Sequence, residues 1–202
     1  FTISPIPNGL LMGFVLGALL LILTGVLSVE SGFSYVDLNT LGVLIGMMLF
    51  VAVVKNSGIF EYIAIKAAKI AKGRPWPLMV LFALITAVLS AFLDNVTTVL
   101  LIGPMTLAIT SMLRINPIPF FMTQIMASNI GGTATLIGDP PNIMIGSAAG
   151  LSFTDFITNT GVAVLFVLAA TIVCFYFIYG RKLHVEPEAM DSILPLDENK
   201  AI

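Results

Sequence analysis

Two short polar stretches interrupt an otherwise apolar chain, and each of them holds a carboxylate. The first is LDNVTT, with Asp94, Asn95, Thr97 and Thr98, and the second is SNIGGTATLIGDPPN, residues 128–142. Carboxylate, amide and hydroxyl oxygens are the groups that can replace the water shell of a small ion. Because each stretch lies between apolar runs, we predict that the two stretches bind an ion inside a membrane.

The second stretch is expected to break a helix in two. Gly131 and Gly132 favour the end of a helix, and Pro140 cannot continue a helix from upstream. Asp139 followed by Pro140 has the pattern of a helix cap and a first helical residue. We therefore predict a first half-helix that ends near Asn129, an unwound segment GGTATLIG, and a second half-helix from Pro140. Discontinuous helices of this kind form the binding sites of many secondary transporters.

The candidate ion and substrate ligands all come from these two stretches. A carboxylate within a membrane costs roughly 2.5–3.5 kcal/mol, whereas a helix cap contributes about 1 kcal/mol and needs no charge. This comparison favours a function for Asp94 and Asp139 over capping alone. The full candidate set is Asp94, Asn95, Thr97, Thr98, Ser128, Asn129, Gly131, Thr133, Asp139 and Asn142. A bound Na⁺ would use Asp94, Asn95, Asn129 and Asp139, and we expect no other cofactor.

The composition is that of an integral membrane protein. The 202 residues are 58% hydrophobic and 10% charged, with a mean hydropathy of +1.05, whereas an ordinary soluble domain has about 25% charged residues. Lipid requires the backbone to satisfy its own hydrogen bonds, so the chain should be all-α and polytopic. We expect a lipid bilayer around it and no nucleic-acid partner. Cys174 and His184 each stand alone, which offers neither a disulfide framework nor a zinc site.

The apolar runs divide the chain into membrane elements. We predict spans over about 10–29 and 41–54, a hairpin over 76–112, a broken helix over 118–149 and a last span over 161–180, followed by an acidic linker over 183–202. Residues 1–182 would form one transmembrane repeat. The two arms of the hairpin are each about 17 residues, the lower limit for crossing, so they form either two short spans or a re-entrant hairpin. The pairs Gly13 with Gly17 and Gly42 with Gly46 favour close helix packing.

Charged residues predict which side each loop faces. With alternate crossings, the loops at 55–74, 114 and 181–182 lie on one side, and Glu30, Asp37 and Asp155 lie on the other. The positive-inside rule makes the basic loops cytoplasmic in a cell membrane. Residues 58–74, with a Lys at every third position from Lys66 to Lys72, have the pattern of an amphipathic helix in the headgroup plane.

Two motifs resemble the ion transporter superfamily. SAFLDNVTTVLL, residues 90–101, and SNIGGTATLIGDPPNIMI, residues 128–145, are similar to its ArsB/NhaD-like permease branch, which is close to the melanosomal P protein. The resemblance implies an elevator-type transporter of two inverted repeats, of which this chain is the N-terminal one. DNVTT would then be the tip of a re-entrant hairpin that faces the unwound loop. The expected partners are the second inverted repeat of the same protein and a second copy in a homodimer.

Four functions are open to a site of this composition. The leading hypothesis is a proton- or sodium-coupled transporter of a small inorganic ion, by Na⁺/H⁺ antiport or arsenite-type efflux. An anionic substrate would contact half-helix amides and the hydroxyls of Thr97, Thr98, Thr133 and Thr135. The alternative is a sodium-coupled di- or tricarboxylate transporter, although that branch commonly has an uncharged tip in place of Asp94. A remote alternative is an intramembrane aspartyl protease, which expects Gly-x-Gly-Asp rather than the LIGD found here. The last is a membrane scaffold.

Overall fold

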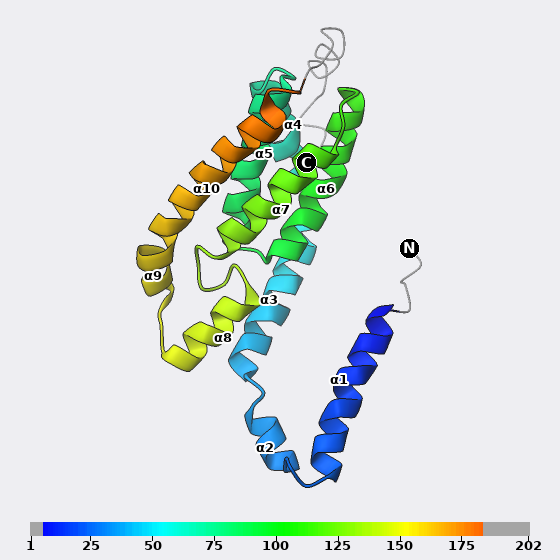
Figure 1. Ribbon diagram of the computed structural model, residues 1–202, viewed down its shortest axis with the longest axis vertical. Coiled ribbons are helices and arrows are strands. Elements are labelled where there is room, and N and C mark those ends of the chain that lie inside the picture. Colours follow the sequence, from blue (N-terminus) through cyan, green and yellow to red (C-terminus); the bar gives the residue numbers. More distant parts are fainter. Residues whose placement is uncertain (1–5, 184–202) are drawn as a thin grey trace. The chain divides into compact units, whose positions relative to one another are not determined.

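The computed structural model describes residues 6–183, with side chains from Met12 onward, and these residues form helices without any strand (Figure 1). The all-α prediction is therefore confirmed for this part of the chain. Three of its helices are long and apolar enough to cross a membrane: Leu38–Lys55, Asn95–Met112 and Phe153–Gly180. The described residues form two compact units, which are divided between Leu38 and Asn39. The predicted linker falls outside the described residues beyond Leu183, as does His184.

The first unit holds α1 (Ile6–Leu23) and α2 (Val29–Ser34). We predicted one span from Leu10 to Val29, but α1 ends at Leu23 because Gly25 adopts a left-handed φ of 73°. A separate helix follows, since the Ser28 side chain accepts a hydrogen bond from the Ser31 amide at 3.0 Å and caps α2.

The second unit contains the remaining helices. They are α3 (Leu38–Lys55), α4 (Ile59–Ile70), α5 (Pro75–Ser90), α6 (Asn95–Met112), α7 (Ile118–Gly132), α8 (Pro140–Ala149), α9 (Phe153–Phe156), the π-helical turn η1 (Ile157–Gly161), α10 (Val162–Phe175) and the π-helical turn η2 (Tyr176–Gly180). α5 and α6 form a helical hairpin joined by residues 91–94. α7 and α8 are the two half-helices, separated by residues 133–139.

The hairpin and α7 make up the centre of the second unit. Phe82 of α5 and Phe120 of α7 are almost fully buried and meet edge to face, with ring centroids 6.4 Å apart. A polar contact ties α7 to α6, because the buried Gln124 Nε2 donates a hydrogen bond to Thr106 Oγ1 at 2.8 Å. A buried hydrogen bond between two side chains specifies how the helices align along their lengths. The hairpin and the first half-helix therefore have a defined register.

α4 packs differently from our prediction. Its apolar face, with Phe60, Ala64, Ala67 and Ala68, is buried against the hairpin. Small alanines let α4 approach α5 and α6 closely. We predicted that this face would enter the headgroup region, but other helices of the same chain cover it. Only its opposite face, with Lys66 and the 64% exposed Ile70, is open.

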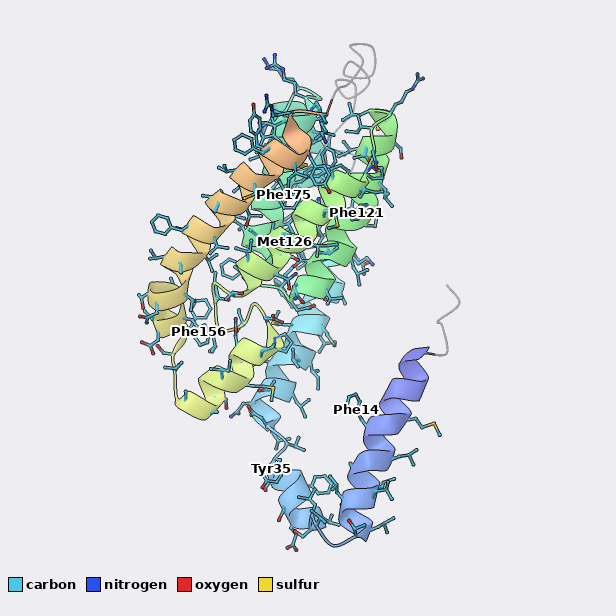
Figure 2. All side chains as sticks on the ribbon, in the orientation of Figure 1. Phe14, Tyr35, Phe121, Met126, Phe156 and Phe175 are labelled. Carbon is cyan, nitrogen blue, oxygen red and sulfur yellow. The ribbon has the colours of Figure 1, made fainter. Side chains whose placement is uncertain are left out.

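The second half-helix is held by the start of the last helix. Phe156 extends from α9 toward α8 (Figure 2) and is buried, and its ring would lie 3.5 Å from a Cβ placed at Gly146. The predicted small-residue packing of Gly13, Gly17, Gly42 and Gly46 stays a prediction, because a Cβ at each position would meet no atom within 4 Å in the described part of the chain.

Candidate ion site

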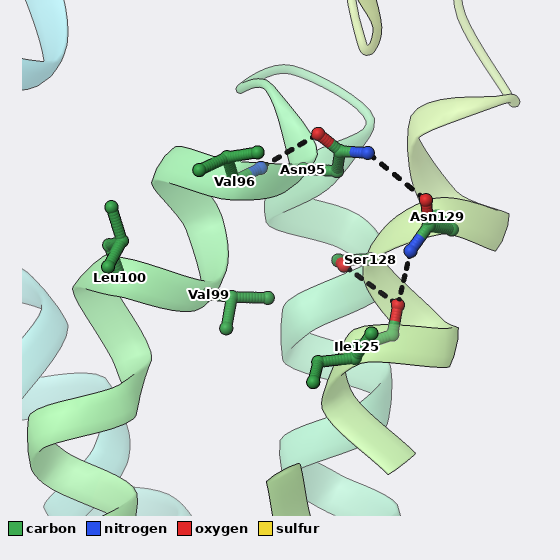
Figure 3. A pocket seen from close by; sticks show the side chains of 7 residues that line it. All are labelled: Asn95, Val96, Val99, Leu100, Ile125, Ser128 and Asn129. Atoms are coloured by element: carbon green, nitrogen blue, oxygen red, sulfur yellow. Dashed lines mark hydrogen bonds between the residues drawn. The ribbon is translucent and has the colours of Figure 1, made fainter. Parts of the chain in front are cut away.

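The turn of the helical hairpin is organised by Asp94. Its Oδ1 accepts a hydrogen bond from the Thr97 amide at 2.8 Å, so Asp94 is the N-cap of α6. The next residue, Asn95, donates from Nδ2 to the side-chain oxygen of Asn129 at 3.1 Å (Figure 3). A side-chain contact thus joins the hairpin turn to the first half-helix, and it brings together two residues that we predicted as ligands.

The first half-helix is longer than the sequence suggests. α7 continues past Asn129 to Gly132, whereas we predicted that the paired glycines would end it. The glycines serve packing instead, since a Cβ at Gly131 would overlap the backbone of Ala87 in α5. Close approach of the two helices buries this turn and keeps it helical. The unwound segment is therefore residues 133–139, shorter than GGTATLIG.

Hydrogen bonds from its own side chains hold this unwound segment in place. The Thr135 hydroxyl donates to the carbonyl of Ala91 in the hairpin turn. Asn142 donates from Nδ2 to the carbonyls of Gly132 at 3.0 Å and Thr135 at 2.9 Å. These bonds connect both half-helices to the loop between them. The amide nitrogen of Asn142 is thereby engaged in holding the loop.

The two carboxylates occupy similar positions but make different contacts. Asp139 is the residue before α8, as we predicted, yet its side chain makes no capping hydrogen bond, unlike that of Asp94. The Asp94 and Asp139 carboxylates also lie close enough for their charges to interact. Two carboxylates at neighbouring helix N-termini form an oxygen site with a net negative charge, which attracts a cation or a proton.

The hydroxyls around these carboxylates differ in how they are satisfied. Thr98 is fully buried, and its Oγ1 has no hydrogen-bond partner in the described chain. Ser128 and Thr133 each donate to a carbonyl of α7, at 2.9 Å to Ile125 and 2.8 Å to Asn129. A buried hydroxyl without a partner is uncommon in folded proteins. Thr98 therefore has a free oxygen one turn below Asp94 and Asn95.

Two cavities meet at Asn129. The first, of about 260 Å³, lies between α6 and α7 and is lined by Asn95, Ser128 and apolar side chains (Figure 3). The second, of about 400 Å³, lies between α7 and the last helix, and its polar lining includes Thr133, Asn159 and Thr160. Asn129 lines both, so this predicted ligand lies between two open spaces.

Sequence reasoning missed Asn159 and Thr160. Both lie on η1, a π-helical turn within the last long helix. Short π-helical insertions often mark functional positions. The available signal was the polar run TNT, residues 158–160, at the start of an apolar span. This run alone does not indicate that residues 158–160 lie near the second stretch, because only the packing of α10 on α7 brings η1 beside Asn129.

The donor set suits a hard cation. It combines two carboxylates with neutral amide and hydroxyl oxygens, the ligands that such cations prefer. Among residues 6–183, no three His, Cys, Asp or Glu side chains are grouped as a zinc site requires. The predicted Na⁺ ligands Asp94, Asn95, Asn129 and Asp139 thus have the appropriate chemistry.

Comparison with known families identifies the chain. The family model described as "Citrate transporter", CitMHS, matches residues 6–197. The chain belongs to the CitMHS citrate transporter family. This family is part of the ion transporter superfamily, so the predicted resemblance to that superfamily is confirmed, whereas the assignment to its ArsB/NhaD-like branch stays a prediction. The description of the family is that of a transporter, and neither a protease nor a scaffold fits that description.

This chain covers only part of the length of the proteins to which it is similar. An uncharacterized transporter of Mycobacterium tuberculosis is 46% identical over 167 residues, which are 83% of this chain and 39% of that protein. The "46 kDa membrane protein" of Mycobacterium leprae is 44% identical over the same shares. The human P protein is 40% identical over 159 residues, 74% of this chain and 19% of that protein. This CitMHS chain thus spans about two fifths of the length of its mycobacterial relatives.

The cap at Asp94 gives a first prediction. Asp94→Ala should lower the free energy of unfolding by about 1 kcal/mol, because α6 loses its N-cap, whereas Asp94→Ser should keep most of it. Thermal unfolding of the full-length protein in detergent measures both. Equal melting temperatures for the Ala and Ser variants would show that capping by Asp94 contributes nothing to stability.

Proposed function

We propose that this CitMHS protein is a secondary active transporter that exchanges Na⁺ for protons at Asp94 and Asp139. The observation that carries the proposal is that the charges of these two carboxylates interact and that each stands directly before a helix, with Asp139 at the end of the unwound segment. Two like charges that interact favour binding of either a cation or a proton, because each of these relieves their repulsion. Because both ligands neutralise the same oxygens, binding of one displaces the other.

The surrounding charges support a cation rather than a free anion as the primary ligand. Residues 86–103 and 123–149, which form the hairpin turn and the broken helix, contain no Lys or Arg. A tricarboxylate that entered this region alone would meet two carboxylates and no basic side chain of these segments. A cation would meet Asp94 and Asp139 together with the side-chain amide of Asn95, which follows Asp94, and that of Asn129, to which Asn95 is hydrogen-bonded.

Exchange follows from the different environments of the two carboxylates. Asp94 is fixed by its bond to the Thr97 amide, so its carboxylate is already held in place at the hairpin turn. Asp139 has no such bond and is the group whose proton is released when Na⁺ arrives. Asn129 and the free hydroxyl of Thr98 complete the oxygen shell of the ion. The energy for uphill transport comes from the gradient of whichever ion moves downhill.

A second candidate, sodium-coupled citrate transport, is favoured by the family description. Na⁺ bound between the carboxylates would offset their repulsion of a carboxylate substrate. The second cavity, with Asn159 and Thr160, has the volume for a small organic anion. In this version the same cation site provides the coupling, and citrate is carried beside it. Arsenite-type efflux is the remaining variant and would use the hydroxyls in the same cavity.

Vesicles that contain the full-length protein and an internal pH dye distinguish these functions. An inward Na⁺ gradient should drive protons out and make the lumen alkaline without any added anion. If Na⁺ alone has no effect but labelled citrate accumulates when Na⁺ is present, the citrate mechanism replaces the exchanger. If sodium drives neither proton movement nor citrate accumulation, but a proton gradient drives arsenite extrusion, the arsenite variant is favoured. Potassium in place of sodium is the control for ion selectivity.

The complete transporter is expected to be longer than this chain. We propose a second inverted repeat that provides the other half of the site, an elevator-type movement, and a homodimer in the cell membrane with the loops at 55–74, 114 and 181–182 in the cytoplasm. The short share of each relative that the chain covers supports a longer protein.

A further inference from the structure

Segments that lie far apart in the sequence meet at one end of the second unit. A single apolar cluster there holds Ala71 after α4, Leu78 of α5, Leu113 after α6 and Phe120 of α7. Leu183, after η2, packs against the same cluster. Figure 1 shows the end of α10 beside α4 and α5, at the same end of the molecule as the α6–α7 connection.

Basic side chains surround this cluster. We call these residues the basic end. They come from three separate connections or helix ends and are Lys69, Lys72, Arg74, Arg114, Arg181 and Lys182. Apart from the half-buried Lys69, all of them are exposed. Segments 69–78, 109–120 and 175–183 contain no Asp or Glu. The tertiary structure therefore gathers an exposed concentration of positive charge that none of these segments has alone.

Two of these cations occupy a backbone conformation that favours glycine. Lys72 and Arg114, with φ of 51° and 52°, are the two non-glycine residues with positive φ in the part of the chain that the structure describes. In both turns the next amide, of Gly73 or Ile115, donates to the carbonyl five residues earlier, at 3.3 and 3.0 Å. This is the Schellman pattern, in which glycine is usual at the left-handed position.

A strained conformation at a cation indicates that the charge itself is needed there. Glycine at either position would adopt the left-handed conformation without steric cost. A cation near a helix C-terminus also interacts favourably with the helix dipole. In α4 Lys69 already provides this benefit from within the last turn, whereas α6 has no basic residue in its last turn. The positions of Lys72 and Arg114 instead place their charges on the turns, at the outermost part of the bundle.

Aromatic side chains of the kind found at the level of lipid headgroups accompany the basic end. Trp76 at the start of α5 meets Tyr176 of η2 edge to face, with centroids 5.1 Å apart. Phe175 and Tyr179 stack at 5.7 Å on the same end of α10. Trp and Tyr concentrate at the membrane–water interface, where their polar atoms reach water and their rings reach lipid.

We infer that the basic end is a binding site for the headgroups of anionic phospholipids. The lipid phosphate would interact with Lys72, Arg114 and the pair Arg181 and Lys182, while Trp76 contacts the adjoining glycerol and upper acyl chain. Clusters of basic residues at a membrane surface attract anionic lipids in this way. The site is separate from the ion site and does not depend on which ion is carried. Bound lipid would join the ends of α4, α6 and α10 at the membrane surface.

The test measures lipid binding by the full-length protein in detergent with native mass spectrometry. Phosphatidylglycerol and phosphatidylcholine with the same acyl chains are the probes. We expect the parent protein to prefer phosphatidylglycerol. Lys72→Gly combined with Arg114→Gly should lower phosphatidylglycerol affinity about 30-fold, from a factor of about five for each lost cation. The control Lys55→Gln, which removes a cation at the end of α3, should bind like the parent.

Folding and competition are measured with further variants. The double glycine variant should melt no lower than the parent, because glycine relieves both turns. Asn also tolerates the left-handed conformation. The double variant Lys72→Asn with Arg114→Asn should therefore lose as much phosphatidylglycerol affinity as the double glycine variant. Equal binding of both lipids by the parent, or full phosphatidylglycerol affinity in the double variants, would overturn the proposal. The proposal would also be overturned if the preference for phosphatidylglycerol appeared only in the triple variant Glu186→Gln, Glu188→Gln and Asp191→Asn, because the acidic segment would then be the occupant of the basic end.

Discussion

Asp139→Asn is expected to reduce sodium-driven proton movement by the full-length protein to the level of empty vesicles. Asn keeps the size of the side chain and remains a favoured residue before a helix. The Asp139 carboxylate makes no capping hydrogen bond, so its loss should change stability little. What the variant loses is the charge that interacts with Asp94 and, in the proposed mechanism, the group that exchanges a proton for Na⁺.

A matched control is Asp155→Asn. The Asp155 carboxylate is exposed and accepts hydrogen bonds from the Ser152 amide at 2.8 Å and the Ser152 hydroxyl at 2.6 Å, which close a capping box at α9. Its role is local, so this variant should transport at the parent rate. The dye-loaded vesicles described above measure both, with melting temperature as a check on folding. The exchange mechanism is wrong if the Asp139→Asn protein moves protons as fast as the parent.

Gly131→Ala should destabilise the protein by roughly 1–3 kcal/mol, the usual range for forcing an extra group into a packed interior. The added methyl would overlap the backbone of Ala87, and a backbone has no alternative rotamer with which to yield. α7 would have to move away from α5, and Asn129 would move with it. We therefore expect a lower melting temperature together with a loss of transport.

Gly103→Ala provides the comparison within the same bundle. Gly103 is also helical and buried, but its nearest neighbour would be the side-chain atom Cε1 of Phe121 at 3.3 Å. A side chain can rotate aside, and Ala has a higher helix propensity than Gly by about 1 kcal/mol. The melting temperature of this variant should stay near that of the parent. Similar losses in both variants would mean that the Gly131 contact has no special role in packing α7 on α5.

Local rules account for the features that were predicted correctly. The break in the second stretch, the position of Asp139 before α8 and the start of that helix at Pro140 depend on backbone preferences within a few residues. The membrane class follows from composition, because so apolar a chain needs lipid around it. The two motifs are long and specific enough to indicate the superfamily.

The amino-acid sequence by itself determined the helical membrane class, the two polar stretches and the residue that begins α8, because these depend on local chemistry. Only the tertiary structure decided that α7 continues to Gly132, that the alanine face of α4 is covered by the hairpin, and that η1 lies beside Asn129. It also decided that Asp94 is a cap while Asp139 is not. The physical reason is that close approach and burial depend on partners distant in the chain, such as Ala87 for Gly131, which no local pattern encodes.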